Sequence, residues 1–328
     1  MFSAIVVREK DDNHTTYGVE QLRLDELPQG EVLFEVEYSS LNYKDALACR
    51  GHRGVVSRLP HVPGIDCAGE VRESTSPDYP IGQKVLVTGY DLGSGAWGGF
   101  SRFVRVPATW VVALPRGLTT RSAMTYGTAG FTAAQCVDAL RRHGVLADSG
   151  PVVVTGATGG VGCLAVAILA KLGYEVTAVS GKPDWHGPLR ELGAKRVAGR
   201  ELVAADERPM LKSQWAGAVD TVGNGTLATL VKSLSYRGCV AACGLVAGDQ
   251  LPLSVYPFLL RGVTLAGIDS AKCPREPRMQ MWQNLSGDWK VELPDEWITE
   301  VTLEQTPGRV ERMLAGETAG RTLVRLRE

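Results

Sequence analysis

The stretch from residue 151 to residue 182 carries the clearest chemical pattern in the chain, PVVVTGATGGVGCLAVAILAKLGYEVTAVSGK. A run that reads as a strand (152–155) meets a helix-like run (160–173) at a turn rich in glycine: Gly156, Gly159, Gly160 and Gly162. Glycine there lets backbone N–H groups approach a pyrophosphate closely, and the N-terminus of the following helix adds a positive partial charge. Because a second strand-like run (175–180) follows, the pattern predicts a dinucleotide-binding βαβ unit, with an unliganded glycine-rich turn as the alternative.

The end of that second strand-like run indicates which dinucleotide is bound. Sites that prefer NAD place Asp or Glu there for the ribose 2′-hydroxyl, whereas this chain has Ser180, Gly181 and Lys182. A carboxylate would repel a 2′-phosphate, and a lysine beside a hydroxyl would attract one. Arg196 and Arg200 follow the next strand-like segment and could add positive charge from the side. We therefore predict NADPH as the cofactor.

The elements that must position this turn fall into two regions. Residues 1 to about 120 read as short Val- and Phe-rich strands separated by Gly and Pro, which predicts a β-rich domain. A helical period begins near Thr119 or Thr120, either of which is a plausible N-cap. From about 150 to 270, strands alternate with helices, which predicts an α/β fold with a doubly wound parallel sheet. The tail reads as one amphipathic helix near TPGRVERMLAG and a final strand, GRTLVRL, that rejoins a sheet begun earlier.

Composition narrows the classes of function. The chain has 328 residues, enough for two domains, and a net charge of −1, so we expect neither nucleic acid nor a membrane surface as partner. No apolar run approaches the ~20 residues that span a bilayer. The N-terminus reads as a strand rather than a signal peptide, and we expect a cytoplasmic protein. The seven cysteines are scattered without a Cys-x-x-Cys pair, so we expect core residues rather than disulfides or a zinc knuckle.

A β-rich N-terminal domain followed by a Rossmann domain resembles the medium-chain dehydrogenase/reductase superfamily. Many members hold a catalytic zinc through a Cys, a His-Glu pair and a further Cys or Asp, and many carry a four-cysteine lobe for a structural zinc. In this chain SSLNYKDAL stands where the first Cys is expected, Ile65 replaces the His in PGIDCAGEV, and the lobe is absent. The resemblance implies a zinc-free enzyme with a GroES-like catalytic domain (1–123 and 268–328) and a Rossmann NADPH-binding domain (124–267). Cys67 is expected to be a core residue.

A narrower resemblance rests on SSLNYKDALA, PGIDCAGEV, GTAGFTAA, VVVTGATGGVG, AVSGK, GAVDTVG, VAACGL and GIDS, which extend over nearly the whole chain. Together these motifs resemble the acryloyl-CoA reductase family, also known as YhdH/YhfP-type quinone oxidoreductases. The resemblance implies NADPH-dependent reduction of acryloyl-CoA to propionyl-CoA. Two alternatives stay open: an NADPH-dependent reductase of free quinones or alkenals, and a non-catalytic NADPH-binding redox sensor.

The resemblance also implies roles for single residues. Asn42 and Tyr43 are candidates for positioning the nicotinamide and donating to the substrate, with Tyr43 as proton donor and Asp45 orienting or tuning it. Alternatively, Tyr43 is a core residue whose hydroxyl is satisfied. Thr128 either contacts the nicotinamide ribose or amide or is a simple N-cap. The remaining residues expected to line the cofactor are Gly156, Thr158, Gly159, Gly160, Val161, Ser180, Gly181, Lys182, Arg200, Leu245, Leu259 and Ser270.

Two surface features complete the expectations. ACRGHRGVVSR carries Arg50, His52, Arg53 and Arg58, which could bind the phosphates of coenzyme A or form an ordinary solvated loop. The apolar segment LPLSVYPFLLRGVTLAGI could supply an edge strand for a homodimer, because zinc-free members commonly join their Rossmann sheets edge to edge.

Overall fold

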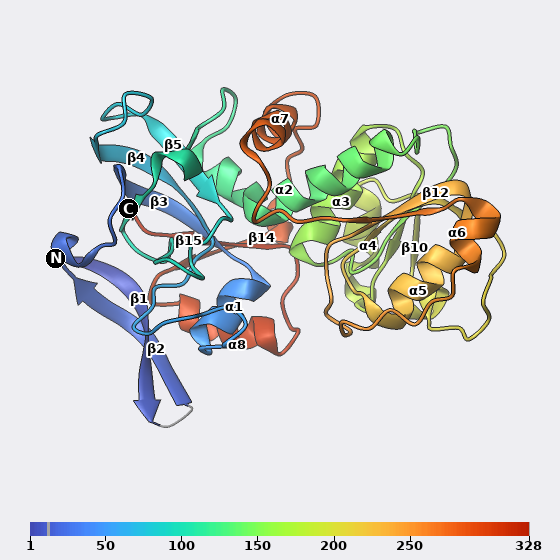
Figure 1. The fold of residues 1–328 in the computed structure, drawn as a ribbon, viewed down its shortest axis with the longest axis horizontal. Helices are drawn as coiled ribbons and strands as arrows, with labels where there is room; N and C mark the ends of the chain where they lie inside the picture. The colour runs from blue at the N-terminus through green and yellow to red at the C-terminus, as the bar shows by residue number, and fades with distance from the viewer. Residues whose placement is uncertain (12–13, 328) are drawn as a thin grey trace. The chain divides into compact units, whose positions relative to one another are not determined.

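Two large sheets of different construction organise the chain in the computed structural model, which describes residues 1–11 and 14–327 (Figure 1). The chain divides into two compact units. The first unit comprises Met1–Thr128, Ala271–Ser286 and Pro294–Glu328, and the second comprises Ala129–Ser270 and Gly287–Leu293. The α/β fold class expected from the sequence is confirmed.

The first unit is built on a mainly antiparallel seven-stranded sheet in the order β14-β15-β3-β4-β5-β7, with β6 paired to β3. Its last strand, β15, pairs antiparallel with β3 and parallel with β14, so the end of the chain does return to a sheet begun early in the sequence. Alternate residues of β3, such as Phe34 and Val36, are fully buried in its core. The strands are β1 (Phe2–Asp11) and β2 (His14–Leu22), which form a separate hairpin, and β3 (Val32–Leu41), β4 (Asp66–Ser74), β5 (Lys84–Thr88), β6 (Phe103–Val106), β7 (Val112–Ala113), β14 (Ile298–Thr302) and β15 (Arg321–Arg325).

Two helices of the first unit lie side by side, and a third begins in the first unit and continues into the second. α1 (Tyr43–Cys49) follows β3 directly and lies beside α8 (Thr306–Leu314) (Figure 1). α2 (Thr120–Arg142) begins after Thr119, whose hydroxyl accepts a hydrogen bond from Ser122 N, and it is kinked at Gly127 (φ 50°).

The expectation of one helix in the tail is wrong, because α7 (Arg275–Ser286) precedes α8. α7 is mostly polar, and its buried stripe begins with a charged residue, so the apolar pattern that indicates a helix in sequence is short. The stripe consists of Arg278, Met281, Trp282 and Leu285.

The second unit is a six-stranded, entirely parallel sheet in the order β10-β9-β8-β11-β12-β13. The chain runs outward from β8 in one direction and then returns to β11 and runs outward in the other, so the strand order reverses between β8 and β11. Ligands of such sheets bind outside the carboxyl ends of the strands at this reversal. The strands are β8 (Val152–Val154), β9 (Val176–Val179), β10 (Arg196–Ala198), β11 (Trp215–Asp220), β12 (Leu234–Ala242) and β13 (Thr264–Gly267).

The helices of this unit alternate with its strands, and α5 and α6 contact β12 (Figure 1). They are α3 (Gly160–Lys171), α4 (His186–Glu191), α5 (Asn224–Ser233) and α6 (Tyr256–Arg261). Short 3₁₀ turns in the chain span Leu24–Glu26, Ala108–Trp110, Pro183–Trp185, Arg200–Val203 and Asp295–Trp297. Within residues 1–11 and 14–327, no helix has the length and apolar character needed to cross a bilayer.

Candidate active site

The carboxylate of Asp66 is the centre of a hydrogen-bonded cluster in the first unit. Asp66 is the first residue of β4 and is fully buried. Its Oδ2 accepts hydrogen bonds from Ser40 Oγ (2.6 Å) and Asn42 Nδ2 (2.8 Å). Thr128 donates twice, from its backbone N to Oδ2 (2.9 Å) and from Oγ1 to Oδ1 (2.6 Å). One carboxylate therefore ties together the end of β3, the start of β4 and the kink of α2.

A second buried carboxyl, Asp45, lies on the other side of Asn42. Its Oδ2 accepts hydrogen bonds from Asn42 N (2.8 Å) and Asn42 Nδ2 (3.1 Å), and its Oδ1 accepts one from Ile65 N (2.8 Å). Burial, followed by the nearby charge of Asp66, raises the pKa of Asp45 to about 7. The sequence suggested that Asp45 orients Tyr43, whereas the structure pairs it with Asn42 and Ile65.

Arg321 brings a buried positive charge to the same cluster from β15. Its Nε donates to Thr125 O (2.8 Å) and one terminal nitrogen donates to Asn42 Oδ1 (3.3 Å). Gly127 lies over the cluster in the left-handed region (φ 50°), where a Cβ would stand 2.5 Å from Asp66 Oδ2 and 2.6 Å from Ser40 Oγ. Only glycine fits at this position, and the kink in α2 follows from that close approach.

Tyr43 is the first residue of α1 and follows this cluster directly. Its side chain is 49% exposed, and within the described residues its hydroxyl makes no hydrogen bond. The Asn42 amide, by contrast, is committed to protein partners at both its oxygen and its nitrogen. The Tyr43 hydroxyl is therefore uncommitted within the described residues, while Asn42 holds the segment in place.

Asp66 and Arg321 are the site residues that the sequence analysis missed. The motif PGIDCAGEV contributed to the family resemblance and to the missing histidine at position 65. Its acid, Asp66, lies in a strand-like run and should also have indicated a buried, hydrogen-bonded carboxylate. Arg321 gave no local signal, because its partners Asn42 and Thr125 lie far away in sequence.

The glycine turn of the second unit has the geometry of a phosphate cradle. It connects β8 to α3 at the point where the strand order reverses. Gly156 has φ 56°, and a Cβ on it would stand 2.2 Å from Thr221 Oγ1. A Cβ on Gly162 would stand 2.3 Å from Gly156 O. The turn is therefore so tightly packed that its backbone, rather than side chains, faces a ligand at the N-terminus of α3.

A buried carboxylate also supports this turn. Asp220, the last residue of β11, accepts hydrogen bonds from Thr155 Oγ1 (2.6 Å) and Gly223 N (2.8 Å) and is fully buried. Burial raises the pKa of Asp220 above its usual value. Thr221 Oγ1 in turn donates to Thr155 O (3.1 Å). The ends of β8 and β11 are thus locked together on both sides of the reversal in strand order.

The end of β9 presents the polar groups expected for a 2′-phosphate site. Ser180 Oγ lies 3.1 Å from Thr158 Oγ1 and accepts a hydrogen bond from Lys182 N (3.1 Å). The Arg200 side chain lies directly on Gly181, where a Cβ would stand 2.4 Å from Arg200 Nε and 2.7 Å from Cζ. The sequence named Arg196 and Arg200 as possible sources of charge, and it is Arg200 that lies against this strand end.

The other residues named from the sequence are spread over the second unit. Gly159 is the N-cap of α3, and Gly160 and Val161 form its first turn. Leu245, after β12, is 66% exposed, and Leu259, in α6, is 76% exposed. Ser270 lies beyond β13. Apolar side chains this exposed are available to a bound ligand or a partner protein.

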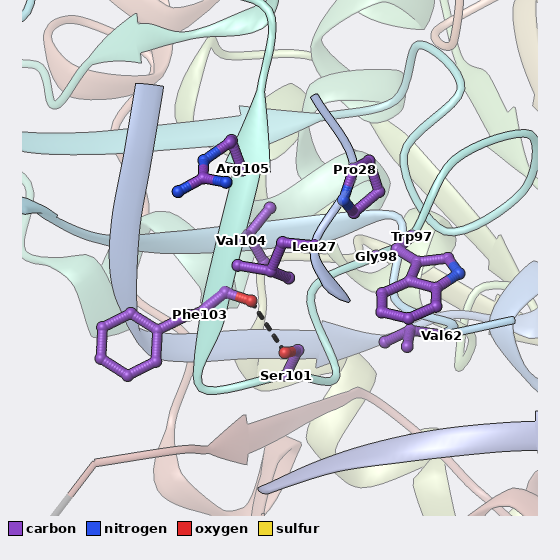
Figure 2. A pocket seen from close by; sticks show the side chains of 9 residues that line it. All are labelled: Leu27, Pro28, Val62, Trp97, Gly98, Ser101, Phe103, Val104 and Arg105. Atoms are coloured by element: carbon purple, nitrogen blue, oxygen red, sulfur yellow. Dashed lines mark hydrogen bonds between the residues drawn. The ribbon is translucent and has the colours of Figure 1, made fainter. Parts of the chain in front are cut away.

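The described residues offer no metal site, and a small hollow in the first unit has no assigned ligand. Among residues 1–11 and 14–327, no cluster of three His, Cys, Asp or Glu side chains could hold a metal ion. Cys67 is fully buried, and burial raises the pKa of its thiol. Figure 2 shows a hollow in the first unit with no room for a water molecule, and we assign it no ligand. It is lined by Leu27, Pro28, Val62, Trp97, Gly98, Ser101, Phe103, Val104 and Arg105.

A GroES-like sheet followed by a parallel nucleotide-binding sheet defines the medium-chain dehydrogenase/reductases. The alcohol dehydrogenase GroES-like domain matches residues 28–116, and the zinc-binding dehydrogenase domain matches residues 160–286. The chain is 48% identical to Escherichia coli AcuI (97% of this chain, 98% of that one) and 46% identical to acrylyl-CoA reductase AcuI of Ruegeria pomeroyi (99% of each). Bacillus subtilis YhfP, named as a quinone oxidoreductase, is 43% identical (97% of each). The chain belongs to the medium-chain dehydrogenase/reductase family, in the branch that contains AcuI and YhfP.

Solved structures agree with this assignment. Escherichia coli YhdH, solved with bound NADPH, has a TM-score of 0.94 at 47% identity and covers 99% of this chain and 100% of its own. Bacillus subtilis YhfP, solved with bound NAD, has a TM-score of 0.95 at 42% identity and covers 99% of each chain. The resemblance inferred from the motifs is confirmed.

Proposed function

We propose that this chain is an NADPH-dependent, zinc-independent reductase that converts the carbon–carbon double bond of acryloyl-CoA to the single bond of propionyl-CoA. The observation that carries the proposal is near-full-length similarity to two AcuI proteins, one of them named acrylyl-CoA reductase without qualification, at 46–48% identity. The first unit is consistent with it, because the exposed Tyr43 directly follows Asn42, which is bonded to the buried carboxylate of Asp66.

The second unit holds the cofactor. When bound, NADPH supplies the hydride that is added to the β-carbon of the substrate. We assign the pyrophosphate to the turn at Gly156 and the first turn of α3, because glycine lets the backbone N–H groups of this helix N-terminus approach a phosphate closely. Thr158, Ser180, Lys182 and Arg200 would hold the 2′-phosphate. Leu245, Leu259 and Ser270 would supply further contacts from this unit. On the family resemblance, we also propose Tyr43 and Thr128 of the first unit as cofactor ligands.

The first unit carries the acid–base chemistry. Reduction of an enoyl thioester requires a proton at the α-carbon and stabilisation of the thioester oxygen while the enolate forms. Tyr43 would hold the proton at its hydroxyl. Asn42, fixed by Asp45, would act as a positioning residue for the start of α1. The catalytic domain is assigned to residues 1–123 and 268–328 and the cofactor domain to residues 124–267.

A second candidate function is reduction of free quinones, which the name of the YhfP relative favours. Rates of NADPH oxidation with acryloyl-CoA, acrolein and a benzoquinone separate the two. The proposal predicts the highest kcat/KM for acryloyl-CoA. A rate tenfold higher on either free electrophile would assign the enzyme to the second function, and failure of all three to consume NADPH would indicate a non-catalytic binding protein.

We also propose a homodimer in the cytoplasm. β13 ends its sheet, and the neighbouring segment exposes Val255 (64%), Tyr256 (51%) and Leu260 (65%). A second copy would cover these side chains and continue the sheet. Because NADPH and acyl-CoA thioesters are metabolites of the cell interior, the cytoplasm is the expected compartment. Sedimentation should give a dimer for the natural chain at micromolar concentration and a monomer for Leu260→Asp; a monomeric natural chain would contradict the proposal.

A further inference from the structure

The segment that follows α1 has an unusual charge pattern. Residues 46–65 contain Arg50, His52, Arg53, Arg58 and His61 and not one acidic residue, although the whole chain has 36 acids against 35 lysines and arginines. This local excess of positive charge lies immediately after the segment that carries Tyr43. A solvated basic loop is common in proteins, so the geometry of the loop decides whether it can act as a site.

Backbone hydrogen bonds and one buried anchor fix the shape of the loop. His52 N donates to Leu47 O (3.1 Å), and Val55 N and Val56 N both donate to His52 O (2.8 and 2.9 Å). Val56 is buried, and Gly51 (φ 64°) lies against Thr15, whose Cγ2 would be 2.4 Å from a Cβ at position 51. The backbone that carries the positive groups is therefore fixed before any ligand binds, which lowers the entropic cost of binding.

The polar groups of the loop face solvent as donors. Arg53, Ser57 and Arg58 are exposed, and within the described residues Ser57 and Arg58 make no hydrogen bond or ion pair with protein. His52 Nδ1 accepts a hydrogen bond from Gly54 N (3.1 Å), so the proton of a neutral His52 is on Nε2, which can donate outward. Arg50 is paired with Glu311 and serves instead to anchor the loop to α8.

The loop begins one short helix away from the reacting group. α1 has seven residues and therefore separates Tyr43 from Arg50 by about 10 Å. In an acyl-CoA thioester the pantetheine arm separates the acyl group from a diphosphate and a 3′-phosphate. We infer that the loop Arg50–Arg58 binds these phosphates of coenzyme A, with Arg53, Ser57, Arg58 and His52 as donors. The inference rests on the proposed reduction of an acyl-CoA and adds the site that distinguishes the thioester from a free enal.

The test combines loop variants with a shortened substrate. Acryloyl-CoA is compared with acryloyl-pantetheine, which has the same reacting group and no phosphate. An exposed ion pair is worth at most about 1 kcal/mol, so Arg58→Ala and Arg53→Ala should each raise the KM for acryloyl-CoA about fivefold. The double variant should raise it about 25-fold. Kinetics with acryloyl-pantetheine and the KM for NADPH should change less than twofold.

Two controls exclude general effects. Arg116→Ala removes another exposed arginine of the first unit, on the loop before α2, and should leave all kinetic parameters unchanged. Higher ionic strength should raise the KM of the natural enzyme for acryloyl-CoA more than that for acryloyl-pantetheine.

The inference is overturned if the double variant and the natural enzyme have the same KM for acryloyl-CoA. It is also overturned if the double variant raises the KM for acryloyl-CoA and for acryloyl-pantetheine by the same factor. These results would leave the proposed reaction standing, because turnover of acryloyl-pantetheine by the natural enzyme tests that separately. A rise in the KM for NADPH instead would assign the loop to the cofactor and also overturn the inference.

Discussion

A methyl group added at Gly181 is expected to change the choice of cofactor without harming the fold. In Gly181→Ala the new Cβ would stand 2.4 Å from Arg200 Nε and 2.7 Å from Cζ, so the guanidinium must move by about 1 Å to reach ordinary contact. A charge-assisted hydrogen bond spans about 2.7–2.9 Å and does not survive that displacement. Losing it removes roughly 1.5–3 kcal/mol, which weakens NADPH binding about 10- to 100-fold.

The assay is kcat/KM for NADPH and for NADH with acryloyl-CoA as substrate. NADH has no 2′-phosphate, so its kcat/KM should change less than twofold in Gly181→Ala. Gly181 lies outside the left-handed region, so alanine fits its backbone and the midpoint of urea unfolding should not fall. Gly187→Ala, where a Cβ meets nothing within 4 Å, is the matched control and should behave as the natural enzyme. Lys182→Ala should show the same selective loss for NADPH.

If Gly181→Ala lowers kcat/KM equally for NADPH and NADH, Arg200 supports the fold and does not bind the 2′-phosphate. A natural enzyme that prefers NADH would refute the assignment of this strand end altogether. The preference between NADPH and NADH has to be measured for this chain, because YhfP, a relative in the same branch, was solved with bound NAD.

Further predictions concern the two buried clusters and the metal. Tyr43→Phe should lower kcat by about 10²–10⁴-fold with little change in the KM for NADPH; a retained kcat would make Tyr43 a cofactor ligand only. Thr155→Val should lower the free energy of unfolding by roughly 1.5–3 kcal/mol, because it removes the hydroxyl bonded to buried Asp220, and Thr155→Ser should restore it. The pKa of Asp45 is raised to about 7 in the fold, so its contribution to stability is present at low pH and is lost as the pH rises through 7. Relative to Asp45→Asn, the natural protein should lose about 1 kcal/mol per pH unit between pH 5 and 7, and parallel pH profiles would contradict this. Dialysis against a strong chelator should leave activity unchanged, and one tightly held zinc per chain would overturn that expectation.

Local patterns in the sequence were sufficient to predict the fold of the second unit and its glycine turn. The glycine turn, the strands on either side of it and the polar end of β9 are contiguous in sequence, so their spacing reports their geometry directly. The strand predicted from GRTLVRL was also placed correctly, because β15 pairs with β3, which begins early in the sequence. α7 was missed because its buried face includes Arg278, which binds backbone carbonyl groups such as Thr88 O (2.7 Å) instead of apolar neighbours.

The site of the first unit could be predicted only in part. Tyr43, Asn42 and Asp45 are adjacent in sequence and were found together. Their arrangement depends on Asp66 and Arg321, whose contacts join residues up to 279 positions apart, and no local pattern encodes such contacts. The same limit applies to Asp220. Its motif, GAVDTVG, was recognised in the sequence, but its hydrogen bond to Thr155, 65 positions away and 2.6 Å long, could not be predicted from a local pattern.

The proposed reaction adds hydride and proton to opposite ends of the acryloyl double bond. Mass spectrometry and NMR of the product formed from acryloyl-CoA and NADPH in D₂O test this directly. We expect propionyl-CoA in a 1:1 ratio to the NADPH consumed, with one deuterium at the α-carbon from Tyr43 and solvent and none at the β-carbon. Deuterium at the β-carbon, or NADPH oxidation without propionyl-CoA, would contradict it.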